Sequence, residues 1–191
     1  MITPQNTLGF SDSARRGGLA PLAPAARFFC AAWLAWIAVG CSAASDPVDT
    51  SNISLRTIEP SEIGTIVAES DDSLVLVNVW ATWCGPCVEE FPHLVKLDRE
   101  YRDQDFGVVC VSVDEGDADA DAKVKRFLAR QEVDFESYRH PGMSADFVQA
   151  VTPQWSGSLP GSFLFRDGRL IEIWEGGQSY ATFERRLLDE F

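Results

Sequence analysis

Residues 77–92 read V-N-V-W-A-T-W-C-G-P-C-V-E-E-F-P, and the prediction of the fold depends on this stretch. It starts inside an apolar run, residues 74–79, which predicts a strand buried on both faces. A short turn then brings Cys84 to the start of a predicted helix. Cys87 lies three residues further on, on the same helical face, so the two sulfurs can close a small disulfide with little chain movement.

The predicted helix start makes Cys84 a candidate for a reactive thiol. Unpaired N–H groups and partial positive charge at a helix N-terminus favour a thiolate over a thiol. Pro86 suits the first turn, where the helix would not use the N–H that proline lacks. Gly85 has no side chain, so another backbone segment can approach Cys84 closely.

A Cys-x-x-Cys pair is also half of a zinc site, which needs a second pair of ligands at suitable spacing. The other cysteines are Cys30, Cys41 and Cys110, and the histidines are His93 and His140. They form no second pair, so we expect no zinc site.

The acidic run D-E-G-D-A-D-A-D at residues 114–121 superficially resembles a calcium loop that starts at Asp117. The sixth position of such a loop is Gly and the twelfth is Glu, but this chain has Ala122 and Leu128 there. We therefore interpret the acidic residues as partners of the positive end of a helix at residues 122–130, and we expect no bound metal.

The formal net charge of the 191 residues is −13. Residues 1–40 contribute +2, from three arginines and one aspartate, so residues 41–191 carry −15. A surface of this sign argues against binding to nucleic acid and against binding to anionic lipid through charge. It suits either a basic partner or a solvated acidic surface.

Residues 1–41 are interpreted as an export signal. Arg27 precedes twelve uncharged residues, too few for a bilayer span of about 20 residues but typical of the apolar core of a secretory signal. The sequence A-V-G-C-S at residues 38–42 resembles a bacterial lipoprotein cleavage box with Cys41 as the lipidated residue, although Ala38 stands where Leu is usual. Cleavage near residues 42–44 and retention as a signal anchor are the alternatives. Residues 42–54 are predicted to form a flexible tether.

The motif W-C-G-P-C after an apolar strand, with Pro92 five residues beyond the second cysteine, resembles the thioredoxin superfamily. The longer form over residues 77–92 is similar to the extracytoplasmic TlpA/ResA branch. The resemblance covers residues 55–191 and implies an α/β thioredoxin fold, in which helices flank a central mixed sheet.

The sequence pattern along residues 55–191 agrees with that fold. Apolar runs predict strands at residues 74–79, 106–113 and 133–138, and helical spacing predicts helices at residues 59–69, 84–101, 122–130, 144–151 and 179–191. Residues 162–165 and 170–174 form a predicted hairpin around the turn 166–169. Cys110 falls inside the second strand, where we expect an inert buried thiol.

The resemblance implies roles for three residues. Cys84 would be the exposed nucleophile that attacks a substrate disulfide, and Cys87 the shielded sulfur that resolves the mixed disulfide. A buried Asp occupies the position of Asn78 in thioredoxin, whereas the TlpA/ResA branch uses a Glu three residues after the second cysteine, here Glu90. Glu90 lies one turn from Cys87, and partial burial would raise its pKa toward neutrality. Glu89 is expected to be solvated.

A second part of the site is expected where Pro160 precedes the hairpin, as the cis-proline of the family does. The resemblance implies that backbone groups of Leu159 pair with a substrate peptide. Trp83 should be exposed beside Cys84, and Trp155 either borders the groove or packs in the core. The residues expected to contact substrate are Trp83, Gly85, Pro86, Leu159 and Pro160.

The implied function is reduction of disulfides in exported proteins, for example in cytochrome c maturation, with no cofactor. Gly85-Pro86 is the dipeptide of reducing thioredoxins, and no histidine lies between the cysteines, as it does in strong oxidants. The family implies a membrane electron donor, and a lipid on Cys41 would anchor the domain in the periplasm. A thiol peroxidase and a copper-site assembly protein share the fold and are the alternatives, although their cysteine settings differ from this one.

Overall fold

The structure is a computed structural model that describes residues 48–116 and 118–191. The predictions for the signal segment 1–41, for Cys41 and for the first part of the tether lie outside the described residues. Ile53 and Leu55, at the end of the predicted tether and the start of the domain, pack partly against the hydrophobic core. Within the described part of the chain, no helix has the length and apolar character needed to cross a membrane.

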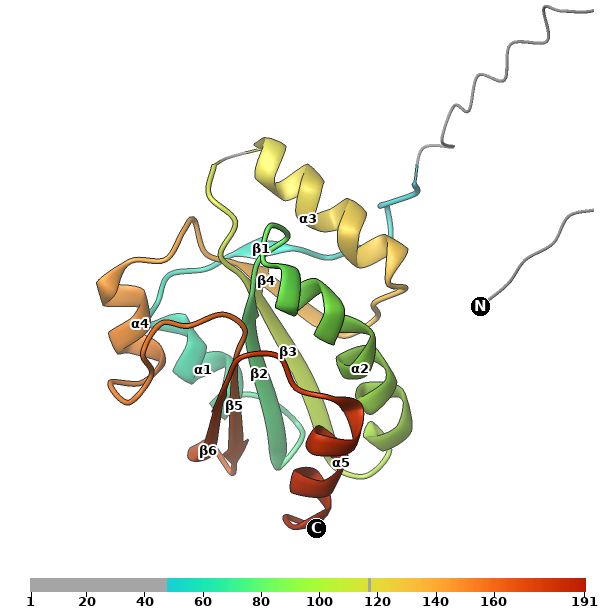
Figure 1. The fold of residues 1–191 in the computed structure, drawn as a ribbon, viewed down its shortest axis with the longest axis vertical. Coiled ribbons are helices and arrows are strands. Elements are labelled where there is room, and N and C mark those ends of the chain that lie inside the picture. Colours follow the sequence, from blue (N-terminus) through green and yellow to red (C-terminus); the bar gives the residue numbers. More distant parts are fainter. Residues whose placement is uncertain (1–47, 117) are drawn as a thin grey trace, which may run out of the picture. The chain divides into compact units, whose positions relative to one another are not determined.

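Six strands form one mixed sheet in the order β1-β4-β3-β2-β5-β6 (Figure 1). β1, β4, β3 and β2 are parallel, and β5 and β6 add an antiparallel hairpin at one edge. The sheet confirms the predicted combination of parallel strands with an antiparallel hairpin. The strands are β1 (Arg56–Thr57), β2 (Leu74–Trp80), β3 (Phe106–Ser112), β4 (Glu136–Arg139), β5 (Gly161–Arg166) and β6 (Arg169–Glu175).

Within the described part of the chain, five helices cover the two faces of this sheet. Parallel crossovers from β2 to β3 and from β3 to β4 run in one direction, so α2 and α3 lie on the same face. α5 packs beside α2 on that face, and α1 and α4 contact each other on the opposite face. The helices are α1 (Glu62–Ala68), α2 (Gly85–Tyr101), α3 (Ala118–Arg130), α4 (Ala145–Val151) and α5 (Tyr180–Leu188).

The element order agrees with the prediction, although several elements begin or end at other residues and one strand was not expected. α1 begins at Glu62 rather than at residue 59, and α5 ends at Leu188 rather than at residue 191. α3 begins at Ala118 rather than at residue 122, so Asp119 and Asp121 lie in its first turn, where acidic side chains favour a helix. β4 begins at Glu136 rather than at residue 133. β1 was not expected, because its two exposed residues carry no hydrophobic pattern.

Aromatic side chains hold α2 against the sheet. Trp80 at the end of β2 packs edge-on against Phe91 of α2, with ring centroids 4.6 Å apart. Phe127 of α3 packs on both rings, at 4.8 and 5.0 Å. These contacts fix the start of α2 directly above the end of β2, where the Cys-x-x-Cys turn lies.

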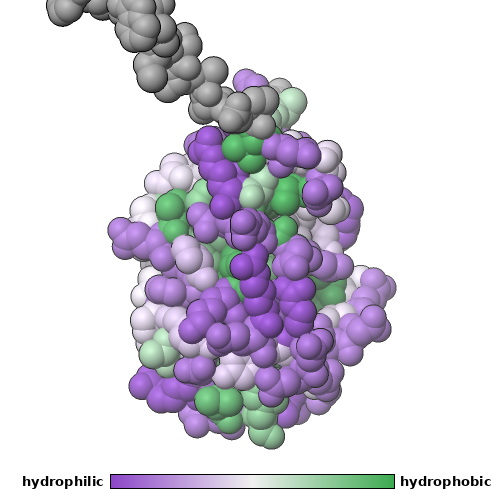
Figure 2. Space-filling view, turned by 90° about the vertical axis from the view of Figure 1, so that its right-hand side faces the viewer, coloured by the Kyte–Doolittle hydropathy of each residue, from purple (hydrophilic) through white to green (hydrophobic). Residues whose placement is uncertain are grey.

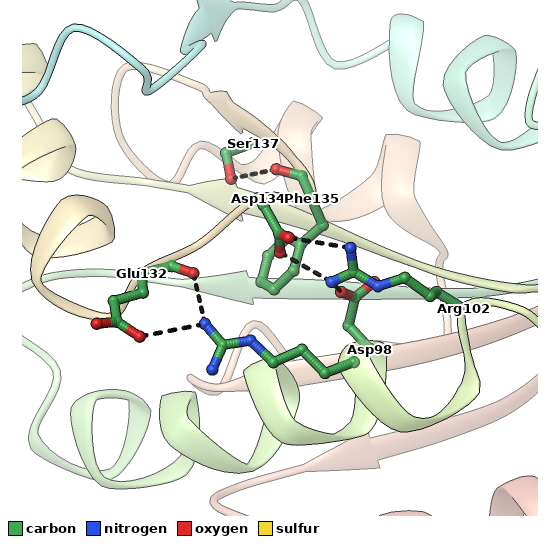
Figure 3. Close-up of polar contacts among 7 residues, drawn as sticks. Asp98, Arg102, Glu132, Asp134, Phe135 and Ser137 are labelled. Carbon is green, nitrogen blue, oxygen red and sulfur yellow. Dashed lines mark hydrogen bonds and ion pairs between the residues drawn. The ribbon is translucent and has the colours of Figure 1, made fainter.

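Charged side chains hold the other end of α2 (Figure 3). Arg102 donates to both carboxylate oxygens of Asp134, at 2.9 and 2.8 Å, and to the buried carboxylate of Asp98. Arg99 donates to the backbone oxygen of Glu132 at 2.9 Å. The segment between α3 and β4 is therefore tied to the C-terminal half of α2.

The described surface shown in Figure 2 is largely hydrophilic, and its hydrophobic residues occur in small separate areas. The largest exposed apolar side chains in the described residues are Trp83, Ile171, Leu188 and Phe191. Of these four side chains, Trp83 is the one beside the cysteine pair, because it follows the end of β2 and directly precedes Cys84.

Candidate active site

Cys84 and Cys87 form a disulfide at the start of α2, with their Cα atoms 5.2 Å apart. Cys84 is the N-cap of the helix rather than its first residue, and its backbone is extended. Its Sγ accepts a hydrogen bond from the N–H of Cys87 at 3.3 Å. The same N–H would stabilise a Cys84 thiolate once the disulfide is reduced.

Cys84 is buried in the oxidised protein rather than exposed as predicted, because its disulfide with Cys87 holds it against the start of α2, although it is less covered than Cys87. Cys84 is 7% exposed and Cys87 is 1% exposed. Gly85 and Pro86 between them are exposed. An attacking group therefore reaches the pair from the side of Cys84.

Glu90 is a buried carboxylate one helical turn beyond Cys87, with 2% of its surface exposed. Its Oε1 accepts from Asn78 Nδ2 at 2.8 Å, and its Oε2 accepts from the backbone N–H of Gln178 at 2.5 Å. Burial raises the pKa of Glu90 to about 7, although both hydrogen bonds act in the opposite direction. A carboxyl with this pKa exchanges protons near neutral pH.

A pocket of about 340 Å³ opens beside Glu90 and is lined by residues of α2 and of the segment before α5. His93 lies on its wall, and the Nδ1–H of His93 donates to the backbone oxygen of Gln178 at 3.1 Å. Gln178 thus contacts both side chains through its main chain. Glu90 and His93 therefore border the same pocket.

Three polar side chains lie in a row on the sheet beneath α2: Cys110 of β3, Asn78 of β2 and Ser162 of β5. Strand register pairs Asn78 with Cys110 on one side and with Ser162 on the other. Asn78 Nδ2 donates to Ser162 Oγ at 2.9 Å as well as to Glu90. Burial, and secondarily the charge of Glu90, raise the pKa of the Cys110 thiol, which agrees with the predicted inert cysteine.

The Leu159–Pro160 peptide bond is cis, as expected. Gly161 pairs with Val79 near the end of β2, so Pro160 lies at the sheet edge from which the Cys-x-x-Cys turn emerges. Pro160 is buried and Leu159 is half-buried. Pro160 accepts from the backbone N–H of Gly176 at 2.9 Å.

Trp155 packs in the core rather than at the border of a groove, since only 3% of it is exposed. Its Nε1–H donates to the backbone oxygen of Ser158 at 3.0 Å, and its ring lies against Gly161 so closely that a Cβ there would sit 2.9 Å from Nε1. Trp155 therefore supports the loop that leads to Pro160.

Trp83 is 62% exposed in the turn before Cys84, as predicted. The preceding residue, Thr82, donates to Asp114 through its N–H at 2.9 Å and through its hydroxyl at 2.5 Å. Asp114 also accepts from Ser112 at 2.8 Å. The exposed indole thus projects from a turn that is anchored to the end of β3.

Sequence reasoning missed Ser162, Gln178 and Asp114 as parts of the site. Ser162 had one usable signal, a polar residue inside an otherwise apolar strand. Gln178 contributes only its main chain, which leaves no trace in the sequence. Within residues 48–116 and 118–191, no three His, Cys, Asp or Glu side chains converge on a position that could hold a metal ion.

Comparison with known proteins places residues 65–165 within a family model described as Redoxin. Over 114 residues the chain is 30% identical to the thiol-disulfide oxidoreductase ResA of Bacillus thuringiensis subsp. konkukian. That match covers 59% of this chain and 61% of the ResA protein, so the chain spans about three fifths of the relative's length. A thioredoxin of Mycolicibacterium smegmatis is 32% identical over 139 residues, covering 68% of this chain and 97% of that protein.

Among solved structures, the chain is similar to one from Chlorobium tepidum, provisionally named thiol:disulfide interchange protein DsbE. The TM-score is 0.52 at 26% identity, over 61% of this chain and 79% of the other. The similarity supports the thioredoxin fold predicted from the sequence.

Proposed function

The chain belongs to the redoxin family, as a TlpA/ResA-like member of the thioredoxin superfamily, and from this premise we propose that it is a thiol-disulfide oxidoreductase that reduces disulfides in exported proteins. One observation carries the proposal: a Cys84–Cys87 disulfide at the start of α2 with a buried carboxyl, Glu90, one turn beyond it. The pair supplies the electrons, and Glu90 supplies a proton acceptor.

The reaction starts from the reduced pair. The Cys84 thiolate attacks one sulfur of the substrate disulfide, so a Cys84–substrate bond forms, the substrate S–S bond breaks and one substrate thiolate leaves. The Cys87 thiol gives its proton to Glu90 and attacks Cys84, which forms the Cys84–Cys87 disulfide and releases the second substrate thiolate. Two electrons pass to the substrate, and its two thiolates take up protons.

Trapping tests this order of steps. Purified Cys87→Ser protein should accumulate a mixed disulfide with a disulfide-bearing model protein such as insulin, seen on a non-reducing gel. In a protein limited to residues 46–191, Cys84→Ser should form none, because Cys87 is 1% exposed and Cys110 is buried. Equal trapping by both variants would contradict the roles of the two cysteines.

The direction of electron flow is proposed from the Gly85-Pro86 dipeptide and the lack of a histidine between the cysteines. Equilibration in thiol buffers, followed by tryptophan fluorescence, should give a reduction potential near or below about −270 mV, as for thioredoxin. A value near about −120 mV would instead make the protein a disulfide-forming oxidant.

The substrate contacts, location and partners extend the same proposal. Trp83, Gly85, Pro86 and the Leu159–Pro160 segment would receive the substrate peptide. Export would place the domain outside the cytoplasm, a lipid on Cys41 would anchor it at the membrane, and a membrane dithiol protein would return its electrons. Mass spectrometry of the mature N-terminus tests the anchor, since a diacylated Cys41 is expected and an unmodified residue from 42–44 would contradict it.

A further inference from the structure

Asn78 has an unusual environment for an amide side chain. It is 1% exposed, and it lies in the middle of the row formed by Cys110, Asn78 and Ser162 under α2. Nδ2 makes both of its available hydrogen bonds, to Glu90 Oε1 at 2.8 Å and to Ser162 Oγ at 2.9 Å. Oδ1 is buried and has no hydrogen-bond partner among the described residues.

This arrangement suits the ionised form of Glu90. Two amide hydrogens point at two acceptors, a carboxylate oxygen and a hydroxyl oxygen. When Oε1 carries a proton, the same arrangement fails, because an N–H would then face an O–H. Rotating the amide by 180° about its Cβ–Cγ bond corrects this mismatch, since Oδ1 can accept from both Glu90 and Ser162.

We propose that Asn78 is a positioning residue for proton transfer, whose amide turns over when Glu90 gains or loses its proton. The inference rests on the proposed function, because it assumes that Glu90 receives the proton of Cys87. In the ionised state, Nδ2 donates to Oε1. In the protonated state, the Oε1–H and the Ser162 hydroxyl donate to Oδ1, while the N–H of Gln178 stays on Oε2 throughout.

The two orientations explain why a neutral amide is useful at this place. Each orientation keeps two hydrogen bonds, so the amide serves either protonation state of Glu90. The first leaves the amide oxygen unpaired and the second leaves the amide NH₂ unpaired, which costs more, so Asn78 still favours the ionised form, and its hydrogen bond lowers the pKa of Glu90. The titratable groups around Glu90 are Cys87, Glu89 and His93 on α2 and Cys110 on β3. Cys110 is held as a thiol, Glu89 is exposed, and His93 contacts the carbonyl of Gln178 rather than Glu90.

The first test follows both groups in the oxidised protein by NMR, with ¹³C on glutamate and ¹⁵N on asparagine. The Glu90 carboxyl and the Asn78 side-chain NH₂ should shift with pH at one common midpoint. Asn52, which is exposed, is the control and should show no shift at that midpoint. An Asn78 signal that stays constant while Glu90 titrates would overturn the proposal.

The second test uses Asn78→Leu, which has a similar shape but cannot donate or accept. The Glu90 midpoint should rise by about 1–2 pH units, because the carboxylate loses a donor. A rise of one unit would slow the attack of Cys87 on the mixed disulfide about fivefold at pH 7, because fewer molecules hold an ionised Glu90. Asn52→Leu should change neither value. An unchanged midpoint in Asn78→Leu would contradict the proposal.

Asn78→Asp covers the case in which the Leu variant does not fold. The new carboxyl beside Glu90 should give two coupled titrations in place of one, with the upper midpoint above the wild-type value. A single wild-type titration would contradict the proposal. These NMR readings need no turnover, so they separate this inference from the proposed function, which the trapping experiment decides.

Discussion

At the scale of single residues, Glu90 is the group whose environment differs most from that of an ordinary side chain on a helix surface. Its neighbour Glu89 is exposed, whereas Glu90 is 2% exposed and is held by two donors. The hydrogen bonds from Asn78 and Gln178 do not offset the cost of removing the Glu90 charge from water, so burial keeps the pKa of Glu90 above its usual value. This has a consequence for stability that can be measured without a substrate.

Glu90→Gln should remove a pH dependence of folding. The pKa of Glu90 is about 7 in the folded protein, against 4.5 as its usual value. Its contribution to stability is therefore fully present below pH 4.5 and is lost as the pH rises through 7, by about 3 kcal/mol in total. Urea unfolding of the oxidised protein at pH 4.5 and pH 8 should show Glu90→Gln gaining about that amount relative to wild type at the higher pH.

Glu89→Gln is the matched control for this measurement, because it changes the charge at an exposed neighbouring position. Its stability relative to wild type should be the same at both pH values. If Glu90→Gln behaves like the control, Glu90 titrates normally and is a poor proton acceptor for Cys87.

Trp83→Ala should separate binding from folding. Trp83 is 62% exposed, so its loss should change the free energy of unfolding by less than about 0.5 kcal/mol. The rate of mixed-disulfide formation with a peptide disulfide should fall, because the indole borders Cys84. Ile171→Ala removes another exposed apolar side chain, on β6, and should leave that rate unchanged. Equal rates for wild type and Trp83→Ala would rule out a substrate contact at Trp83.

At the scale of elements, α2 carries the chemistry at its first turn and is held at both ends. Trp80, Phe91 and Phe127 pack at the end that bears the cysteines. Arg102 joins Asp98 and Asp134 at the other end. Burial raises the pKa of Asp98 even though Arg102 lowers it, so this carboxylate depends on its partner.

Arg102→Ala should destabilise the protein by about 1–3 kcal/mol at pH 8. Breaking a fully buried pair costs about 3–5 kcal/mol, and the lower value allows for the partial exposure of Arg102. The loss should shrink as the pH falls, because Asp98 then takes up a proton and no longer needs a cation. Arg99→Ala breaks the exposed contact with Glu132 and should cost less than about 1 kcal/mol at either pH. If Arg102→Ala and Arg99→Ala lost the same free energy of unfolding, the ion pair with the buried Asp98 would not stabilise the protein more than an exposed pair does.

At the scale of the whole molecule, one sheet with both faces covered supplies the core. Among the strands, β2, β3, β5 and β6 contribute buried side chains to the described core, and Tyr138 of β4 packs partly against it. Ile53 and Leu55 add partly buried side chains before β1. Residues 46–191 form a compact unit by themselves. The described core therefore lies within residues 46–191.

Residues 46–191 alone should unfold cooperatively, at the same urea concentration as the full chain. Residues 58–191 should unfold at a lower concentration, since this version lacks Ile53, Leu55 and the pairing of β1 with β4. Circular dichroism during urea titration measures both. A lower midpoint for residues 46–191 than for the full chain would show that the first 45 residues stabilise the domain.

Much of the fold could be predicted because its signals are local. The apolar run in β2 predicted a fully covered strand, and all seven of its residues are buried. The helical spacing of Phe91, Leu94 and Leu97 predicted the buried face of α2. β1 escaped prediction because two exposed residues carry no periodicity, and the start of α3 was misplaced because acidic residues suit a loop and a first helical turn equally.

The sequence by itself determined the cysteine pair, its place at a helix start and the helical face shared by Cys87 and Glu90, since these follow from spacing within one short segment. Only the tertiary structure decided what surrounds Glu90. Asn78 meets Ser162, 84 positions later, because β2 and β5 pair in one register, and the N–H of Gln178 reaches Glu90 because the segment after β6 passes over α2. Strand register and main-chain position follow from the packing of the whole sheet. The burial that raises the pKa of Glu90 depends on the same packing.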